Sequence, residues 1–294
     1  MKLLFTIKAA ELQKQYKLRG TDISRLIGGV DEFKLLERED GLRIWEPTIT
    51  GDGSFYSDLN NSNNWYYFPD KPEYSIAKSF LGTGAVLEVG CGEGFFATKQ
   101  NLQNYVGLEL NKEAVEQAKA KGLDVRLSGF HEFSIHNKAS MGTVCSFQVL
   151  EHLADPEEYF RSANLVLQEG GVVITAVPAE DSFAGTIRNN CLNAPPHHVT
   201  RWTNRCLRTF PEQYGFRCIE IINIPVEPCH YEWFWSTLLG KAFSSGSSNM
   251  SKRQKLKRKI VLSLLKLLGA LETIPEDLCI PGHTVLAVHR KVSA

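Results

Sequence analysis

The chain has 294 residues, which is enough for one sizeable α/β domain with an extension. Basic and acidic residues each number 33, so the formal net charge is zero, which argues against a globally basic nucleic-acid-binding protein. The seven cysteines include no Cys-x-x-Cys pair, and Cys145 and Cys218 lie in apolar runs, as reduced, buried cysteines do. No apolar run reaches about 18 residues and no signal-peptide core is present at the start, so we expect a cytoplasmic protein.

The first 80 residues show no clear repeat and are predicted to form an N-terminal extension, residues 1–80. They end in a polar and aromatic stretch that contains Trp65, Tyr66, Tyr67 and Phe68. Such aromatic side chains need a surface on which to pack. They either anchor the extension to the following domain or form a lid over a substrate pocket.

After the extension, strand-like and helix-like segments alternate. Strands are expected at 85–89, 105–108, 124–128, 143–147, 172–178, about 216–224 and 283–290. Asn111 is suited to cap one helix, and Asp155 caps a second helix that begins at Pro156 and runs to about Gln168. Buried strands that alternate with helices indicate an α/β fold with a doubly wound, mostly parallel, seven-stranded Rossmann-like sheet, built from 81–225 and 281–294.

Residues 226–280 form a predicted helical insertion before the last strand. Six basic residues lie between Lys252 and Lys259, and the apolar stretch 260–271 follows directly. As a single helix, this segment is basic at its start and broadly apolar behind. It either packs on its own domain with a solvated charged end or makes peripheral contact with a membrane through 252–271.

The run VLEVGCGEGFF, from Val86 to Phe96, is the most informative segment of the chain. Its apolar strand leads into Gly90, Gly92 and Gly94, which carry no Cβ where the backbone must turn and approach a ligand. A glycine turn between a strand and a helix predicts a nucleotide-like cofactor site at the carboxyl ends of the strands. Phe95 stands where the nicotinamide dinucleotide fingerprint needs a small residue, which disfavours NAD(P).

Two acidic residues sharpen this prediction. Glu88 lies inside the apolar strand, where a carboxylate is costly unless it is paired. It is expected to contact the cationic end of the cofactor, directly or through water, or else to pair with a nearby amide. Glu109 ends the next strand, 19 residues after Gly90, at the spacing of a carboxylate that accepts hydrogen bonds from ribose hydroxyls.

Four segments, VLEVGCGEG, VGLEL, SFQVLEHL and GHTVLAV, resemble class I S-adenosylmethionine-dependent methyltransferases, in particular a small-molecule group with Leu-Glu-His after the fourth strand. The resemblance covers about residues 81–177 and the final strand. It implies S-adenosylmethionine as the cofactor, with its methionine part held by Gly90, Gly92 and Gly94 and its ribose by Glu109.

The resemblance also implies roles for later residues. Gln148 belongs to the segment that lines the cofactor pocket, and Phe130 is expected to stack on the adenine, because the region after the third strand lacks the usual acid or amide. Quinone-type O-methyltransferases carry a Glu-x-x-Glu-His pattern associated with a divalent metal. Here Gln148 replaces the first carboxylate, so no metal site is predicted. The alternative to a functional role for Glu151 and His152 is that they form a structural hydrogen-bonded pair at the start of the next helix.

A stiff loop follows the fifth strand, where Pro195 and Pro196 precede His197 and His198. Methyl transfer from a sulfonium requires in-line alignment and, for a protonated acceptor, removal of a proton. Histidine suits that role near neutral pH. His152, His197 and His198 are therefore candidate catalytic bases, with no ranking among them.

We therefore predict an S-adenosylmethionine-dependent methyltransferase that acts at oxygen on a small-molecule or lipid- or glycan-linked acceptor by in-line displacement. A nucleic-acid acceptor is not expected, because the Asn/Asp-Pro-Pro-aromatic motif of nucleic-acid amino methyltransferases does not follow the fourth strand. The alternatives are an NAD(P)-linked oxidoreductase and a cofactor-binding scaffold without catalytic activity.

Overall fold

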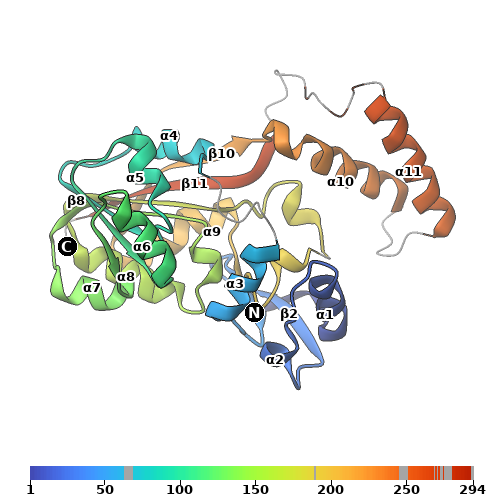
Figure 1. Ribbon diagram of the computed structural model, residues 1–294, viewed down its shortest axis with the longest axis horizontal. Helices are drawn as coiled ribbons and strands as arrows, with labels where there is room; N and C mark the ends of the chain where they lie inside the picture. Colours follow the sequence, from blue (N-terminus) through green and yellow to red (C-terminus); the bar gives the residue numbers. More distant parts are fainter. Residues whose placement is uncertain are drawn as a thin grey trace.

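Two β-sheets organise the molecule, a seven-stranded main sheet and a four-stranded N-terminal sheet (Figure 1). The computed structural model describes residues 1–62, 69–188, 190–244, 251–267, 269, 271, 274 and 280–292. The aromatic stretch Trp65–Phe68 lies outside these residues, so its packing or lid role stays a prediction.

The main sheet has the strand order β10-β11-β8-β7-β4-β5-β6. Its strands are β4 (Ala85–Val89), β5 (Tyr105–Glu109), β6 (Val125–Leu127), β7 (Met141–Phe147), β8 (Leu167–Pro178), β10 (Phe216–Pro225) and β11 (Pro281–Lys291). All neighbouring pairs are parallel except those of β11, which runs antiparallel to β8 and to β10. This arrangement confirms the predicted doubly wound, mostly parallel, seven-stranded sheet.

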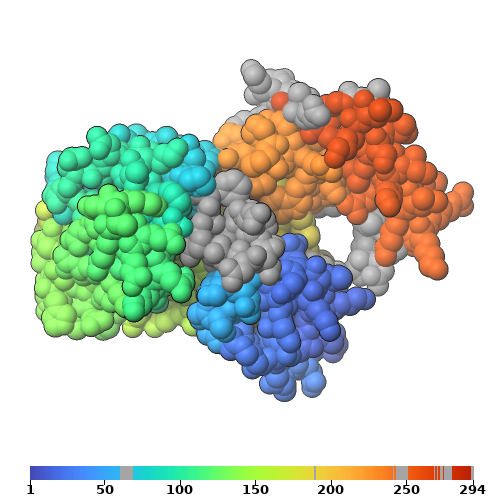
Figure 2. Space-filling model, in the orientation of Figure 1, coloured from blue at the N-terminus to red at the C-terminus, as the bar shows by residue number. Residues whose placement is uncertain are grey.

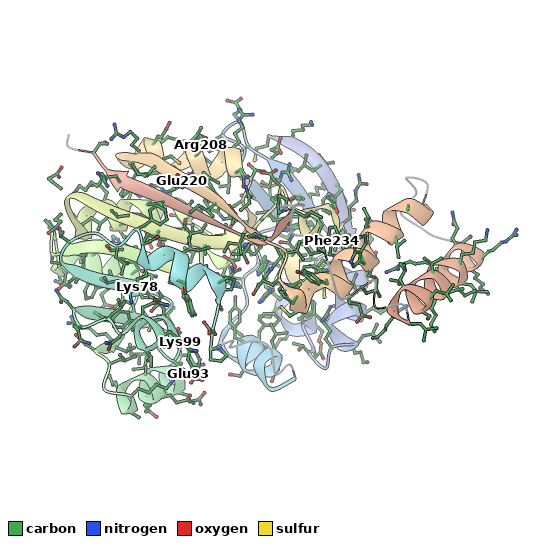
Figure 3. All side chains as sticks on the ribbon, turned by 90° about the horizontal axis from the view of Figure 1, so that it is seen from above. Lys78, Glu93, Lys99, Arg208, Glu220 and Phe234 are labelled. Atoms are coloured by element: carbon green, nitrogen blue, oxygen red, sulfur yellow. The ribbon has the colours of Figure 1, made fainter. Side chains whose placement is uncertain are left out.

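Helices cover both faces of the main sheet. They are α4 (Pro72–Lys78), α5 (Phe95–Gln100), α6 (Lys112–Ala120), α7 (Phe130–His136), α8 (Pro156–Val166) and α9 (Asn204–Thr209). Apolar side chains of α4, α5 and α6 form one core with the sheet, and those of α7, α8 and α9 form another. Seen from above, Lys78 of α4 and Lys99 of α5 accordingly lie on the side of the sheet opposite Arg208 of α9 (Figure 3).

Both predicted helix caps are confirmed. The Oδ1 atom of Asn111 accepts from the backbone N–H of Glu113 (2.9 Å), and Oδ1 of Asp155 accepts from the N–H of Glu158 (2.9 Å). The expected end of α8 near Gln168 was wrong by two residues, since the helix ends at Val166. The carbonyls of the last turn there accept hydrogen bonds from the segment that leads into β7, and β8 begins directly.

The N-terminal sheet was not anticipated from the sequence. It consists of β1 (Lys2–Lys8), β2 (Glu32–Glu37), β3 (Arg43–Glu46) and β9 (Thr200–Arg201), all antiparallel. The helices of the extension are α1 (Ala9–Lys17), α2 (Ser24–Ile27) and α3 (Gly53–Ser62). A third apolar core, around Phe33, Trp45 and Phe55, joins these elements and includes Cys191 and Ala194 from beyond β8. The extension therefore packs against the loop that leads to the paired histidines.

Five 3-10 turns complete the secondary structure of the described residues: η1 (Leu150–His152), η2 (Ala184–Thr186), η3 (Cys191–Asn193), η4 (Phe210–Tyr214) and η5 (Pro228–His230).

The six described cysteines are free. Cys145 is buried as expected, but the expected burial of Cys218 was wrong. Cys218 lies on β10, an edge strand, and its Sγ atom is 3.8 Å from the Arg208 guanidinium, so it stays partly exposed.

The insertion contains two α-helices, α10 (Tyr231–Ser244) and α11 (Lys252–Leu267), and α11 is the single helix expected for the basic and apolar segment. They pack on each other and project beyond the end of the main sheet, as the orange and red segments show (Figures 1 and 2). Within the described residues, no helix combines the length and the apolar character that a membrane span requires.

A buried ion cluster joins the two sheets. Glu180, which follows β8, accepts a hydrogen bond from Nε of Arg201 on β9 (2.7 Å) and pairs with Arg43 on β3. Glu180 and Arg201 are almost completely buried. Breaking a buried ion pair is costly because the remaining charge loses its partner without regaining water.

Substituting Arg201→Met should therefore lower the free energy of unfolding by about 3–5 kcal/mol. Arg161→Met is the matched control, because Arg161 pairs with Asp155 (3.4 Å) on the surface and should change stability by less than about 1 kcal/mol. Urea unfolding followed by circular dichroism measures both values. Equal effects of the two substitutions would show that the buried cluster does not join the sheets energetically.

Candidate active site

The glycine turn between β4 and α5 has no room for side chains. Gly90 and Gly94 have φ angles of +70° and +75°, in the left-handed region that glycine adopts without strain. A Cβ at Gly90 would lie 2.6 Å from Cγ2 of Val149, and one at Gly94 would lie 2.2 Å from Cδ1 of Leu123. The turn therefore presents bare backbone at the carboxyl edge of the main sheet, where a cofactor can approach closely.

Glu109 lies directly beside this turn. Its Oε2 atom accepts from the N–H of Gly92 (2.9 Å), and its Oε1 atom accepts from the N–H groups of Leu110 (2.7 Å) and Asn111 (2.8 Å). Three backbone donors thus hold the carboxylate in one orientation at the end of β5. The structure brings Glu109 and the glycine turn together as the spacing predicts, and binding of ribose hydroxyls by Glu109 stays a prediction.

Glu88 is buried and paired with a phenol. The hydroxyl of Tyr105, on the neighbouring strand β5, donates to Oε2 of Glu88 at 2.6 Å. Burial raises the pKa of Glu88 to about 8, although the hydrogen bond from Tyr105 counteracts part of that shift. Sequence reasoning missed Tyr105, since an aromatic residue at the start of a strand carries no signal for this pairing. Contact between Glu88 and the cofactor stays a prediction.

Phe130 and Gln148 lie at the same edge of the sheet. Phe130 begins α7 after β6, and its ring packs against that of Tyr159 at 5.2 Å between centroids. Gln148 follows β7 with φ at +59°, an uncommon conformation for a residue with a Cβ. Its buried amide nitrogen has no hydrogen-bond partner within 3.5 Å among the described residues. Burial raises the pKa of the Glu73 carboxyl, and the positive charge of Lys71 lowers it in part.

The three candidate histidines form one cluster. His152 lies on η1, after β7, whereas His197 and His198 follow η3. Ring nitrogens from all three lie within 4.8 Å of one another. The rings of His197 and His198 are stacked at 4.3 Å, and the ring of His152 meets the other two edge-on. The structure thus brings together residues that are 45 positions apart.

Backbone contacts hold the two histidine segments against each other. The N–H of Val199 donates to the carbonyl of Glu151 (2.8 Å), and the hydroxyl of Thr200 donates to the carbonyl of Leu150 (2.9 Å). These contacts fix the loop after η3 onto η1. The convergence of the histidines therefore follows from the path of the main chain rather than from contacts among the rings alone.

Hydrogen bonds also define the tautomers of two histidines. Nδ1 of His152 lies 2.7 Å from the carbonyl of His197, which can only accept, so Nδ1 carries the proton and Nε2 a lone pair. The Asn193 amide is best oriented with its oxygen toward the Arg201 guanidinium (3.3 Å) and its nitrogen donating to Nδ1 of His198 (3.3 Å). That orientation leaves the His198 proton on Nε2.

Glu151 faces two of these imidazoles without bonding to either. Both carboxyl oxygens are buried and have no hydrogen-bond partner among the described residues. Oε1 lies 3.9 Å from Nε2 of His152 and 4.0 Å from Nε2 of His198. These distances exceed a hydrogen bond, so Glu151 and His152 are not the structural pair considered as an alternative.

Burial sets the charge of the whole cluster. It raises the pKa of Glu151 to about 8. It lowers the pKa of His152 to about 4 and that of His197 to about 3, and it holds the pKa of His198 well below its usual value. At neutral pH the three imidazoles are therefore uncharged.

Tyr56 also belongs to the site and was missed from the sequence. Its hydroxyl lies 3.1 Å from Nδ1 of His152, and the two rings meet edge-on at 5.7 Å. Tyr56 comes from α3, 96 residues before His152, so no local pattern could indicate the contact. The N-terminal extension thus contributes a polar side chain to the histidine cluster.

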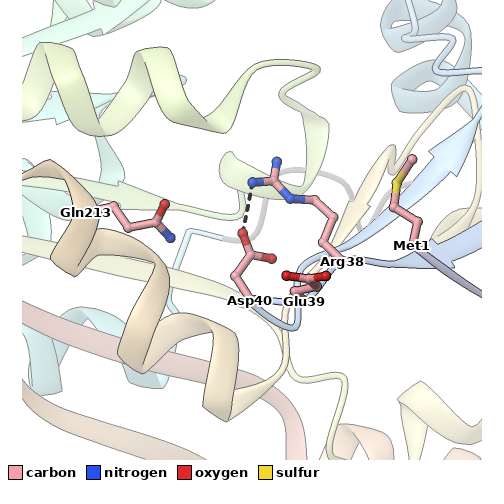
Figure 4. Close-up of a pocket in the computed structure, with 5 residues that line it drawn as sticks. All are labelled: Met1, Arg38, Glu39, Asp40 and Gln213. Atoms are coloured by element: carbon pink, nitrogen blue, oxygen red, sulfur yellow. Dashed lines mark ion pairs between the residues drawn. The ribbon is translucent and has the colours of Figure 1, made fainter.

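A cavity of about 420 Å³ lies elsewhere, lined by Met1, Arg38, Glu39, Asp40 and Gln213 (Figure 4). Arg38 and Asp40 form an ion pair within it at 2.8 Å. None of its lining residues belongs to the glycine turn or to the histidine cluster. The cavity therefore contains none of the predicted cofactor-binding residues.

The arrangement of the main sheet and the glycine turn agrees with comparison to known proteins. A family described as a methyltransferase domain matches residues 66–221, which is just over half of the chain. The chain belongs to this family. Family membership confirms the predicted enzyme class and the predicted cofactor, S-adenosylmethionine, and does not favour an NAD(P)-linked oxidoreductase.

Relatives and solved structures agree with this assignment. A Mycolicibacterium smegmatis protein named probable S-adenosylmethionine-dependent methyltransferase is 29% identical over 56% of this chain and 64% of its own length. A ubiquinone biosynthesis O-methyltransferase of Xanthomonas oryzae is 27% identical over 35% of this chain and 46% of its own. The chain thus spans less than two thirds of the length of either relative.

Two solved structures share the fold of the methyltransferase domain. A SAM-dependent methyltransferase from Archaeoglobus fulgidus matches with a TM-score of 0.50 at 15% identity, over 74% of this chain and 91% of that one. An S-adenosylmethionine-dependent methyltransferase from Mesorhizobium loti matches with a TM-score of 0.50 at 13% identity, over 76% and 98%. At these identities the likeness concerns the fold alone.

The raised pKa of Glu88 predicts how stability depends on pH. Because the folded-state pKa of about 8 exceeds the ordinary value of 4.5, the native state is favoured at low pH and loses up to about 1.4 kcal/mol per pH unit between the two values. Glu88→Gln removes this titration and keeps an acceptor for Tyr105. Its unfolding free energy relative to wild type should therefore rise from pH 5 to pH 8 in urea titrations.

Glu116→Gln serves as the control, because Glu116 is an exposed acid on α6 and its substitution should shift stability equally at both pH values. A difference between Glu88→Gln and wild type that did not change with pH would contradict the assigned pKa shift.

Proposed function

We propose that this chain transfers the methyl group of S-adenosylmethionine to a hydroxyl oxygen of a small-molecule or lipid- or glycan-linked acceptor. The observation that carries the proposal is the Glu151 carboxyl, buried without a hydrogen-bond partner among the described residues and flanked by two imidazoles. An oxygen atom can lie about 2.8 Å from both Glu151 Oε1 and His152 Nε2, because their 3.9 Å separation is less than twice that length. A hydroxyl group can donate a hydrogen bond to one of these side chains and accept a hydrogen bond from another, so it can bind at a site that contains both donors and acceptors.

The cradle for the cofactor is the glycine turn with Glu109 beside it. S-adenosylmethionine supplies an electrophilic methyl group on its sulfonium when bound. The bare backbone of Gly90 and Gly94 admits the cofactor closely, and the fixed Glu109 carboxylate orients it. Alignment of the acceptor oxygen with the methyl–sulfur bond then provides the main catalytic effect.

The histidine cluster accepts the proton of the acceptor hydroxyl. Nε2 of His152 carries the lone pair and accepts the acceptor's proton as the O–H bond breaks and the O–CH₃ bond forms. The Nε2–H group of His198 donates to the same oxygen and positions it. With its pKa lowered to about 4, His152 is neutral above about pH 5, so its protonation should not reduce the rate between pH 8 and pH 6.

Substituting His152→Asn should lower kcat about 10²-fold or more, because the proton acceptor is lost. Transfer of a labelled methyl group to a panel of phenols, quinols, hydroxy acids and glycans measures the rate. His136→Asn is the control, since His136 is exposed on α7 and should leave the rate unchanged.

Calorimetry with S-adenosylhomocysteine separates the alternatives. His152→Asn should bind this product like wild type, and NAD should give no heat with either. Binding without transfer to any acceptor would support a non-catalytic scaffold. Methylation of nitrogen rather than oxygen would contradict the proposed acceptor chemistry.

The outer face of α11 favours a lipid-linked acceptor. Leu256, Ile260, Leu264 and Leu267 are between 51% and 82% exposed and recur every three or four residues. At 100° per residue they form one stripe along the helix. Lysines border the stripe on both sides: Lys252, Lys255 and Lys259 on one side and Lys257 on the other.

The opposite face of α11 packs against α10. Val261, Leu262 and Leu265 are partly buried there, and the Arg258 guanidinium donates to the hydroxyl of Ser236. The apolar stripe therefore points away from the domain. We infer that it lies on the surface of an anionic membrane, with apolar side chains among the lipid tails and lysines near the headgroups.

Replacing Leu256, Ile260 and Leu264 together by Gln should abolish sedimentation with vesicles that contain phosphatidylglycerol. Wild type should bind these vesicles and bind pure phosphatidylcholine vesicles much more weakly, because the lysines need anionic lipid. The matched control is Leu110→Gln with Leu127→Gln, two exposed leucines outside the insertion. Equal sedimentation of wild type and the triple variant would contradict the membrane contact.

A further inference from the structure

Three side chains of the types that bind metal ions lie together at the base of the insertion. Glu227 and His230 occur where the chain leaves β10, at η5, and His283 lies near the start of β11. The N–H of Val226 donates to the carbonyl of Ile280 at 3.1 Å, which holds the two ends of the insertion together. The three side chains therefore come from both ends of the insertion, the segment that follows β10 and the start of β11.

The geometry of the three groups is compact. One nitrogen or carboxylate oxygen from each lies within 4.8 Å of the other two. Nδ1 of His230 is 3.7 Å from Oε2 of Glu227, and the rings of His230 and His283 are 4.3 Å apart at 63°. Glu227 and His230 share one side of the 3-10 turn because that helix has three residues per turn.

We propose that Glu227, His230 and His283 bind a divalent transition metal of the Zn²⁺ type. Two imidazoles and one carboxylate are a donor set that Zn²⁺ uses in proteins. The ligand atoms of a tetrahedral zinc site lie about 3.3 Å apart, so the present arrangement needs shifts of only about 1 Å per atom. The site is partly exposed on every ligand, which leaves an entry path for the ion.

The surroundings suit such a site. The Sγ atom of Cys229 lies 3.7 Å from Nδ1 of His230, and a water molecule can complete the coordination of the ion. Nε2 of His283 lies 3.3 Å from the hydroxyl of Thr284, a contact that orients the ring. The indole of Trp233 packs against both imidazoles at 5.7 and 6.1 Å. A bound ion would connect the two ends of the insertion, because both ends contribute ligands, and would restrict the movement of α10.

Cobalt titration of the full chain tests the proposal. After removal of metal by chelation and dialysis, Co²⁺ alone should bind with one equivalent at this site and give the visible absorption of four-coordinate cobalt, which Zn²⁺ displaces. Glu227→Gln and His283→Asn should each weaken Co²⁺ binding at least about tenfold. His198→Asn is the matched control, because it alters the other histidine cluster and should leave this absorption unchanged.

A second measurement covers the case in which His283→Asn disturbs β11. Zn²⁺ should slow proteolysis within the insertion of wild type and of His198→Asn but not of Glu227→Gln, whose fold is checked by circular dichroism. Cobalt absorption that persists in Glu227→Gln and His283→Asn but disappears in His198→Asn would overturn the proposal. Metal binding is read without any methyl transfer, so this result does not depend on the proposed activity.

Discussion

The position of the histidine loop depends on the buried ion cluster of Glu180, Arg201 and Arg43. Arg201 follows the loop that presents His197 and His198, and the same residue lies in β9, which pairs with β3. The cluster therefore ties the main sheet, the N-terminal sheet and the histidine loop to one another. Because a buried charge without a partner is so unfavourable, this arrangement allows little freedom in where the loop lies.

Burial also determines the charge state of the site. The same exclusion of water raises the pKa of Glu88 and Glu151 and lowers that of His152 and His197. All four groups are thereby shifted toward their neutral forms. Neutral donors and acceptors in a buried site are compatible with the neutral hydroxyl acceptor that we propose.

The insertion combines two features that act on one structural unit. The candidate metal site joins its two ends, and α11 carries the exposed apolar stripe at its far side. An ion at the base of the insertion would fix the direction in which α10 and α11 project from the main sheet. The orientation of the exposed apolar stripe relative to the glycine turn would then be set at the base of the insertion rather than along the helices.

The sequence by itself determined the main sheet, the glycine turn and the helix starts at Asn111 and Asp155. These features depend on interactions within a few residues, such as the missing Cβ of Gly90 or an N-cap hydrogen bond, so a local pattern reveals them. The cofactor followed from the same short segments. The position of Glu109 beside Gly92 could be predicted because parallel strands end at a common edge.

Only the tertiary structure decided the rest. Tyr105 pairs with Glu88 across two strands, Tyr56 reaches His152 from the extension, and β9 completes the N-terminal sheet with only two residues. Each contact joins segments far apart in the chain, and none changes the local residue pattern. The charge of the histidines was also beyond the sequence, because their pKa depends on how completely the folded chain excludes water around them.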